Sequence, residues 1–437
     1  MINPNSYLSN YFKESSFFFK LEDNLNYSVF MILALLILFG SCKENIEENF
    51  STNNFGAGST IETDYVGIVP AADRIAVYAP LLRSKKVGLV VNQTSAVGDR
   101  HLLDSLLSLE VDVAKVYTPE HGFTGTADAG EKIADSKRAN IPIVSLYGKK
   151  KKPSPEDLAG IDILVFDIQD VGVRFYTYIS TLHYIMEAAA ENHIPLIVLD
   201  RPNPNGFYVD GPILESAFKS FVGMHPVPVV YGMSIGEYAT MINGEGWLEG
   251  GQTCDLKVIE CKYYDHTMTY DLPIKPSPNL PNLRSILLYP SLCFFEGTTV
   301  SVGRGTDQQF QLFGHPALKD KMPYKFTPVS KPGAKSPKHM GKECYGMEFH
   351  HMDSSTLHND KRLQLGFLLR MYKEVTATGE DFFLVNNNFF DKLAGSESLK
   401  KMISQGFSEE EIVASWQDDL EKFKQVRAKY LLYDDFK

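Results

Sequence analysis

The sequence is poor in several features that would each point to a different class of protein. It has no long basic run, and its 43 lysines and arginines are outnumbered by 54 acidic residues, which gives a formal net charge of −11. This balance disfavours nucleic acid as a partner, because phosphate binding needs clustered positive charge. One basic cluster, Lys149 to Lys152, falls in a predicted loop, and we interpret it as a solvated turn.

Cysteine is scarce as well. The chain of 437 residues has five cysteines, and no two of them form a C-x-x-C pair. This excludes the redox and zinc motifs that are built on that spacing. Cys254 and Cys261 are near enough in the sequence to bridge across a hairpin, although nothing in the pattern requires it.

Motifs for cofactors and activated nucleophiles are missing too. No G-x-G-x-x-G follows the first predicted strand, so no dinucleotide is predicted. Ser95 is a serine that an esterase or amidase could use, but we expect the chain to have no G-x-S-x-G elbow, so this activity is not predicted. The adjacent His350 and His351 lack a third ligand at a recognisable spacing, so no metal site is predicted. The sequence therefore predicts neither a cofactor nor a metal.

The N-terminal segment has the pattern of an export signal. Phe30 to Phe39 is an apolar run of signal-peptide length, too short to cross a bilayer comfortably. Gly40 and Ser41 then precede Cys42, an arrangement that resembles the end of a bacterial lipoprotein signal. We expect residues 1–42 to be a lipoprotein-type signal with Cys42 as the lipidated residue, and residues 43–62 to be a flexible tether.

Lipidation at Cys42 would make this an exported protein, periplasmic or associated with the outer membrane, and would limit its membrane contact to the anchor. The segment before the apolar run is long and has no adjacent basic cluster, which initiation at Met31 would explain. The alternative is that the run is a buried strand or helix of the globular part.

The middle of the chain alternates between apolar strands and helices. Strands are predicted at residues 87–92, 113–117, 143–146, 163–168 and 195–199, and helices at 101–109, 155–159 and 177–192. This alternation predicts an α/β fold with a parallel sheet and right-handed crossovers. The chain is longer than a usual single core, so two domains are expected.

After Gly206 the pattern becomes mixed. Helices are predicted at residues 234–243, 363–376, 389–393, 396–405 and 408–430, and strands at 256–260 and 345–351. Ser234 and Glu237 have the spacing of a capping box, which gives Glu237 a structural role. The last helix is expected to run without a break from its N-cap, Ser408.

Polar residues follow four of the predicted strands. They are Asn92 after the first strand, Glu120 and His121 after the second, Asp167, Asp170, Arg174, Tyr176 and Tyr178 after the fourth, and Asn203 after the fifth. The carboxyl ends of parallel strands share one edge of the sheet, so these side chains can meet in one cleft. For any one of them, a cap, a turn or a surface charge is the alternative.

A second polar group lies further along the chain, at Glu296 and Arg304. Glu296 follows two phenylalanines and precedes a glycine, and Arg304 lies between two glycines. A carboxyl group among aromatic rings can have a raised pKa, or Glu296 can simply be the ion-pair partner of Arg304. The sequence leaves both alternatives open.

Several motifs together resemble those of the exo-β-N-acetylmuramidases of the NamZ/YbbC-like family. They are TPEHGF at 118–123, FDIQDVGVRFYTY at 166–178, DRPNP at 200–204, VDGPILE at 209–215, PSPNLP at 276–281, FEGTTVSVGRGT at 295–306, FDKLAG at 390–395 and RAKYLLY at 427–433. The resemblance covers the chain from about residue 65 to its end. It implies a Rossmann-like parallel-sheet domain, which we place at residues 63–215, and a smaller α+β C-terminal domain at 216–437 that closes the active-site cleft.

The resemblance also implies an activity: removal of β-1,4-linked N-acetylmuramic acid from the non-reducing ends of peptidoglycan fragments. By motif match, the family's catalytic glutamate falls on Glu120, which would be the general acid. Glycoside hydrolysis usually needs a second carboxylate, for which Asp167, Asp170 and Glu296 are candidates, unless the sugar's acetamido group takes that part. A non-catalytic muropeptide-binding lipoprotein on the same fold is the alternative.

The expected substrate contacts follow from the chemistry of muramic acid. Arg174 and Arg304 could hold its lactyl carboxylate by bidentate pairing. Tyr176, Tyr178 and Phe123 could stack on sugar faces. Asn92, His121 and Asn203 complete the set of predicted substrate-binding residues.

Overall fold

A computed structural model describes residues 67–127, 136–138, 140–148, 150–385 and 388–436. All of these residues belong to one compact unit, Tyr65–Lys437. The predicted signal, Cys42 and the tether lie outside the described residues, so the structure does not bear on them. Within the described part of the chain, no helix is both long and apolar enough to cross a membrane.

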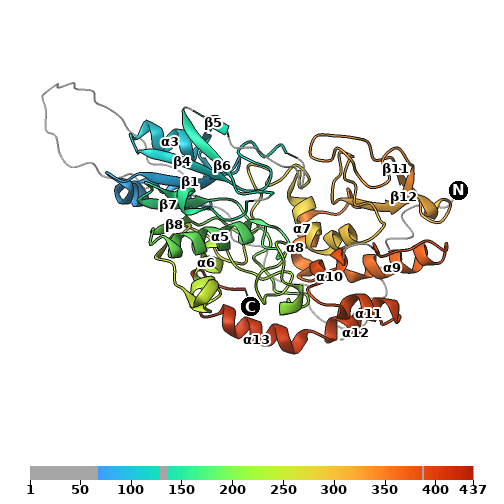
Figure 1. The fold of residues 1–437 in the computed structure, drawn as a ribbon. Helices are drawn as coiled ribbons and strands as arrows, with labels where there is room; N and C mark the ends of the chain where they lie inside the picture. Colours follow the sequence, from blue (N-terminus) through green and yellow to red (C-terminus); the bar gives the residue numbers. More distant parts are fainter. Residues whose placement is uncertain (1–66, 128–135, 139, 149, 386–387, 437) are drawn as a thin grey trace, which may run out of the picture. The chain divides into compact units, whose positions relative to one another are not determined.

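The largest element is a seven-stranded sheet with the order β5-β6-β4-β1-β7-β8-β9. Its strands span Val87–Val91 (β1), Val113–Thr118 (β4), Ser136–Arg138 (β5), Ile141–Ser145 (β6), Ile163–Asp167 (β7), Leu196–Leu199 (β8) and Leu256–Ile259 (β9). The first six are labelled in Figure 1. Only β5 pairs antiparallel. The six parallel strands follow the Rossmann order 3-2-1-4-5-6, which confirms the predicted fold class.

The strands are apolar throughout because both faces of the sheet are covered. Val90 and Phe166 belong to one buried cluster, which includes Leu182 of helix α5 (Tyr178–Glu191). Leu89 belongs to the other, which includes Leu106 of helix α3 (Leu102–Ser108). Successive side chains of a strand point to opposite faces, so a strand buried on both sides must be apolar at nearly every position.

The C-terminal part is built from a small antiparallel sheet and helices. The sheet has the order β10-β12-β11, with strands at Leu312–His315 (β10), Tyr324–Phe326 (β11) and Cys344–Glu348 (β12). The helices are α7 (Leu283–Leu292), α8 (Ser354–Asp360), α9 (Leu365–Thr376), α10 (Phe389–Ala394), α11 (Ser398–Ser404), α12 (Glu409–Ala414) and α13 (Gln417–Arg427). This mixture matches the expected α+β character.

The prediction of one helix over residues 408–430 was wrong. The structure divides it into α12 and α13 at Ser415 and Trp416. Trp416 leaves the helical conformation with φ −115° and ψ 3°. Its indole is buried and donates a hydrogen bond from Nε1 to Asp210 Oδ1 at 3.1 Å, so a tertiary contact interrupts a locally helical sequence.

Two further features of the fold were not evident from the sequence. Helix α7 was not predicted, because Pro290 lies inside it and proline normally ends a helix. The sheet takes in β9, which follows residue 215, the point at which we divided the two domains; that division stays a prediction. Cys254 and Cys261 are both free and buried, so they do not bridge.

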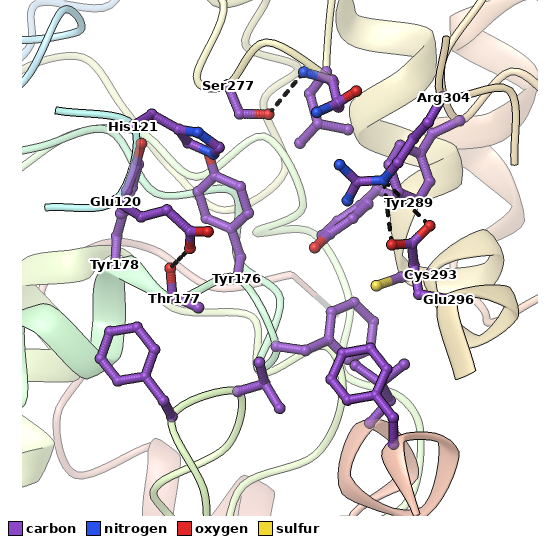
Figure 2. A pocket seen from close by; sticks show the side chains of 18 of the residues that line it. Glu120, His121, Tyr176, Thr177, Tyr178, Ser277, Tyr289, Cys293, Glu296 and Arg304 are labelled. Atoms are coloured by element: carbon purple, nitrogen blue, oxygen red, sulfur yellow. Dashed lines mark hydrogen bonds and ion pairs between the residues drawn. The ribbon is translucent and has the colours of Figure 1, made fainter. Parts of the chain in front are cut away.

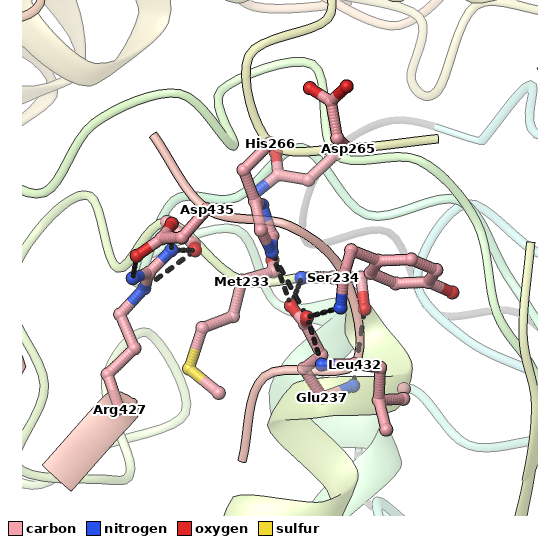
Figure 3. Close-up of polar contacts among 12 residues, drawn as sticks. Met233, Ser234, Glu237, Asp265, His266, Arg427, Leu432 and Asp435 are labelled. Carbon is pink, nitrogen blue, oxygen red and sulfur yellow. Dashed lines mark hydrogen bonds and ion pairs between the residues drawn. The ribbon is translucent and has the colours of Figure 1, made fainter. Parts of the chain in front are cut away.

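A buried polar cluster ties the C-terminal tail to helix α6 (Ile235–Gly244), as Figure 3 shows. Glu237 forms the predicted capping box with Ser234 and also accepts hydrogen bonds from the Leu432 and Tyr433 amides at 2.8 and 3.3 Å. His266 Nε2 lies 3.0 Å from the same carboxylate, and both side chains are 0% exposed. A single carboxylate therefore joins three segments of the chain.

Ser234 is also the middle residue of a G-x-S-x-G sequence, Gly232 to Gly236, so the expectation that the chain has no such sequence was wrong. Its hydroxyl donates to Asp200 Oδ2 at 2.7 Å and accepts from the Glu237 amide at 3.2 Å. The side chain is wholly buried. Ser234 is therefore a helix cap in this fold, and no nucleophile is exposed at this turn.

We expect Glu237→Ala to lower the free energy of unfolding by about 3–5 kcal/mol, because it leaves several buried donors without an acceptor. Glu411→Ala is a matched control, since Glu411 forms the same capping box with Ser408 on the exposed helix α12. It should cost only about 1 kcal/mol. Urea unfolding of the two variants measures both values, and equal losses would contradict a tertiary role for Glu237.

Candidate active site

A cavity of about 300 Å³ lies at the carboxyl ends of the parallel strands. Its lining includes Glu120, which follows β4, and residues 175–178, which follow β7. These two strands flank β1, where the order of the parallel sheet reverses. That reversal is the place where open α/β sheets bind ligands. Six of the predicted site residues line the cavity: Glu120, His121, Tyr176, Tyr178, Glu296 and Arg304.

Glu120 is held at the cavity by the geometry of the strand end before it. Strand β4 stops at Thr118, and Pro119 cannot continue the ladder, so the chain turns at Glu120. Thr177 occupies the N-cap position of α5 but does not cap the helix; its hydroxyl donates to Glu120 Oε2 at 2.9 Å (Figure 2). The Glu120 side chain is only 9% exposed. The ends of β4 and β7 are thus joined through the carboxylate.

His121 lies next to Glu120 in a strained conformation. Its φ is +69°, in the left-handed region that costs a non-glycine residue about 1–3 kcal/mol. Gly122 follows with φ +71° and completes the turn without such a cost. His121 Nδ1 donates to the Ala127 carbonyl at 2.6 Å, because a carbonyl can only accept. In the neutral ring, Nε2 is then the acceptor nitrogen.

Aromatic residues form a wall of the cavity. The ring of Tyr176 meets Tyr178 and Tyr289 edge to face, at centroid distances of 4.8 and 6.0 Å. Burial raises the pKa of all three phenols, so their hydroxyls stay protonated. Such a wall offers both apolar ring edges and hydroxyl donors, which is the combination that sugar rings require.

Glu296 and Arg304 form an ion pair on the side of the cavity opposite Glu120 (Figure 2). Arg304 Nε lies 3.2 Å from the carboxylate, and the two side chains are 24% and 20% exposed respectively. Burial acts to raise the pKa of Glu296, but Arg304 and Lys338 outweigh it and the pKa is lowered. Of the two alternatives that the sequence left open, the structure favours the ion pair.

The other predicted carboxylates have partners inside the protein. Asp167 is fully buried and accepts from Arg201 Nε and Nη2 at 2.6 and 2.9 Å. Asp170 accepts from the Tyr231 hydroxyl and from the Gly172 amide. Burial raises the pKa of Asp170 to about 6. Neither residue lines the cavity.

Three predicted substrate-binding residues also serve the fold. Arg174 is fully buried and donates to four main-chain carbonyls at 2.7–2.9 Å. Asn92 Oδ1 accepts from the amide and hydroxyl of Thr94. Asn203 Nδ2 donates to the Met233 carbonyl at 2.8 Å. None of the three lines the cavity, so the structure gives each of them a position within the protein rather than facing a ligand.

Sequence reasoning missed Thr177, Tyr289 and Lys338. Thr177 lay inside a motif that we quoted, and only its contact with Glu120 shows its use. Tyr289 belongs to α7, the helix that was not predicted because Pro290 lies inside it. Lys338 Nζ donates to the carbonyls of residues 295, 296, 298 and 300, and no local pattern connects it with them.

A third potential metal ligand does lie beside the adjacent histidines: Glu348, His350 and His351 place ligand atoms within 4.8 Å of one another. The side chains of His350 and His351 are 47% and 74% exposed. The group lies on β12 and the turn after it, outside the lining of the cavity.

We expect Glu296→Gln to lower the free energy of unfolding at neutral pH by removing the partner of Arg304. Because the pKa of Glu296 is lowered in the folded protein, its contribution is complete above the ordinary value of 4.5 and is lost as the pH falls through the lowered value. Urea unfolding at a series of pH values measures the difference between wild type and variant.

Asp307→Asn is the control for this experiment, because it removes a 90% exposed carboxylate that pairs with Lys331. It should change stability little at any pH. If the effect of Glu296→Gln stayed constant down to the lowest pH at which both proteins fold, the pair would not be responsible.

Comparisons with known proteins agree with this geometry. The family model described as exo-beta-N-acetylmuramidase NamZ, N-terminal, matches residues 87–284, and the corresponding C-terminal model matches residues 287–433. The peptidoglycan beta-N-acetylmuramidase NamZ of Bacillus subtilis (strain 168) is 36% identical over an alignment of 429 residues, which covers 93% of this chain and 99% of that protein.

Two crystal structures of DUF1343 family proteins from Bacteroides fragilis are similar to the fold. One has a TM-score of 0.78 with 44% identity, and the other a TM-score of 0.71 with 29% identity. Each comparison covers 84% of this chain and 99% of the other. Since the two family models together account for residues 87–284 and 287–433, the chain belongs to the exo-beta-N-acetylmuramidase NamZ family.

Proposed function

We propose that the protein is an exo-acting β-N-acetylmuramidase. It hydrolyses the terminal, non-reducing β-1,4-linked N-acetylmuramic acid of peptidoglycan fragments, as part of cell-wall turnover and recycling. The observation that carries this proposal is the position of Glu120: a nearly buried carboxyl group in an aromatic-walled cavity at the switch point of the sheet. The curated relative that matches almost the whole chain is named as a peptidoglycan beta-N-acetylmuramidase.

Glu120 acts as the general acid in this mechanism. Its proton passes to the glycosidic oxygen while the bond from that oxygen to C1 breaks, so the leaving sugar departs as a neutral alcohol. The Thr177 hydroxyl fixes Oε2 of the carboxyl group, and this orientation limits the directions in which the proton can be delivered. The tyrosine wall excludes water from one side of the sugar.

The substrate's acetamido group acts as the nucleophile, in place of a second carboxylate of the protein. Among the described residues that line the cavity, Glu296 is the one other carboxylate, and its charge is held by Arg304 and Lys338. An ion-paired carboxylate on the far side is a poor nucleophile. The acetamido oxygen instead attacks C1 and forms an oxazolinium ring as the leaving group departs. Water then attacks C1 and gives a proton to Glu120, which opens the ring and restores the acid.

We expect Glu120→Gln to lower kcat by about 10²–10⁴-fold on a muramyl-glucosamine disaccharide, because the leaving alcohol then lacks its proton donor. The loss should be smaller on a 4-nitrophenyl β-muramide, whose leaving group needs little protonation. Steady-state release of N-acetylmuramic acid and of nitrophenol measures the two rates. Full turnover of the disaccharide by the variant would remove Glu120 as the acid.

Thr177→Val is a milder companion to that variant. It removes the hydroxyl on Oε2 but keeps the volume and the carboxyl group, so a loss of about tenfold in kcat is expected. A loss as large as that of Glu120→Gln would mean that Thr177 has a more direct part in the reaction.

We also propose that the protein is an exported lipoprotein, held in the periplasm or at the outer membrane through a lipid on Cys42. The apolar run at residues 30–39 and the small residues before Cys42 support this proposal. The proposed substrate also supports export, because peptidoglycan fragments arise outside the cytoplasm.

We expect Cys42→Ser to move the protein from the membrane fraction to the soluble fraction. The thiol of Cys42 is the atom that would carry the lipid, and one serine hydroxyl cannot replace it. Ser41→Ala is the matched control, since it keeps a small residue before the cysteine and should leave the protein with the membranes. Fractionation followed by immunoblotting decides, and unchanged fractionation of Cys42→Ser would contradict lipidation.

A further inference from the structure

The basic cluster that the sequence places in a solvated turn includes two lysines with carboxylate partners. Lys150 lies 2.9 Å from a carboxylate oxygen of Asp157, and Lys152 lies 3.2 and 2.7 Å from Glu187 and Glu191. Lys151, between them, is different: its ammonium lies 3.9 Å from the centroid of the Phe221 ring, and no ion pair joins it to a carboxylate of the described residues. One cation of the cluster is thus set apart from its neighbours.

The position of Lys151 places its charge beside the cavity. Phe221 lines the cavity together with Tyr147, and their ring centroids are 6.2 Å apart. Burial lowers the pKa of Lys151, and the Glu120 carboxylate acts in the opposite direction. The ammonium is therefore partly withdrawn from water and within electrostatic range of the catalytic carboxyl group, without bonding to it.

The cations on the opposite side of the cavity already have acceptors. Arg304 bonds to Glu296, and Lys338 donates to a ring of main-chain carbonyls around the same residue. A substrate anion that approached them would compete with an existing carboxylate. Near Glu120 the situation differs, because the ammonium of Lys151 contacts the Phe221 ring and forms no ion pair with a carboxylate of the described residues.

The proposed substrate presents such an anion at a suitable place. In N-acetylmuramic acid the bond to be cleaved is at C1, and the lactyl ether with its carboxylate is at C3, two carbons away on the same ring. A cation that recognises this carboxylate must lie near the acid that serves C1 but must not pair with that acid. Lys151 meets both conditions.

We propose that Lys151 binds the lactyl carboxylate of the terminal muramic acid and so distinguishes this sugar from N-acetylglucosamine, which has a hydroxyl group at C3. This inference rests on the proposed function and names the residue that determines its specificity. The ring of Phe221, which lines the cavity, contacts the ammonium at 3.9 Å from the ring centroid and leaves its N–H groups able to bond to a carboxylate.

A double-mutant cycle between protein and substrate tests the proposal. The substrates are 4-nitrophenyl β-N-acetylmuramide and the analogue in which the lactyl carboxylate is a neutral carboxamide. Lys151→Met should raise KM for the acid about 10- to 100-fold and leave kcat within about threefold. On the carboxamide, wild type and Lys151→Met should agree within about threefold, because neither can form the ion pair.

Two further variants sharpen the result. Lys150→Met removes the adjacent charge, which pairs with Asp157, and should behave as wild type on both substrates. Lys151→Arg keeps the charge and should recover part of the affinity for the acid. Equal losses of Lys151→Met on both substrates, or no loss on the acid, would overturn the inference.

The same assay separates this inference from the proposed function. If wild-type protein released no nitrophenol from the muramide, the proposed function would fail before Lys151 was tested. If wild type were active and Lys151→Met were equally active, the assignment of Lys151 alone would fail, and the carboxylate would be held elsewhere.

Discussion

The buried guanidinium of Arg174 connects parts of the chain that form the candidate active site. It donates to the main-chain carbonyls of Pro212, Val227, Leu393 and Ala394. The first two lie in the segment between β8 and β9, and the last two belong to helix α10. A guanidinium carries five donors in a rigid plane, so it can hold several carbonyls in one arrangement. Burial lowers the pKa of Arg174 to about 9, which reflects how completely it has been removed from water.

This anchor positions the cavity from both sides. The residue after Arg174 is Phe175, the first of the four that carry the aromatic wall and the Glu120 contact. On the other side, Leu393 bonds to the guanidinium through its carbonyl and lines the cavity with its side chain. Gly395 allows the close approach, because a Cβ there would lie 2.8 Å from the guanidinium and the backbone has φ +80°. An arginine that does not line the cavity therefore fixes the position of two segments that form it.

Some of the polar residues at the strand ends stabilise the fold, and others face the cavity. Asp167 and Asp170, at the end of β7, accept hydrogen bonds from donors inside the protein, whereas Glu120 reaches the cavity from the end of β4, on the other side of β1. The difference arises at the turn after β4, where Pro119 ends the strand and His121 adopts a left-handed conformation. Strain of this kind persists only where the surrounding structure compensates for it, and it is common at functional sites.

The sequence by itself determined the fold class, because strands buried on both faces are recognisable from uninterrupted apolar runs, and the alternation with helices implies a parallel sheet. It also identified the strand-end turn at Glu120, since proline and glycine have local consequences. It could not show which strand-end residues face the ligand. For Arg174 and Asp167 that depends on partners more than 30 residues away in the chain. Only the tertiary structure decided this, and it likewise divided the last helix at Trp416 and set Lys151 apart from its neighbours, because burial and charge pairing are made between segments that the chain order does not bring together.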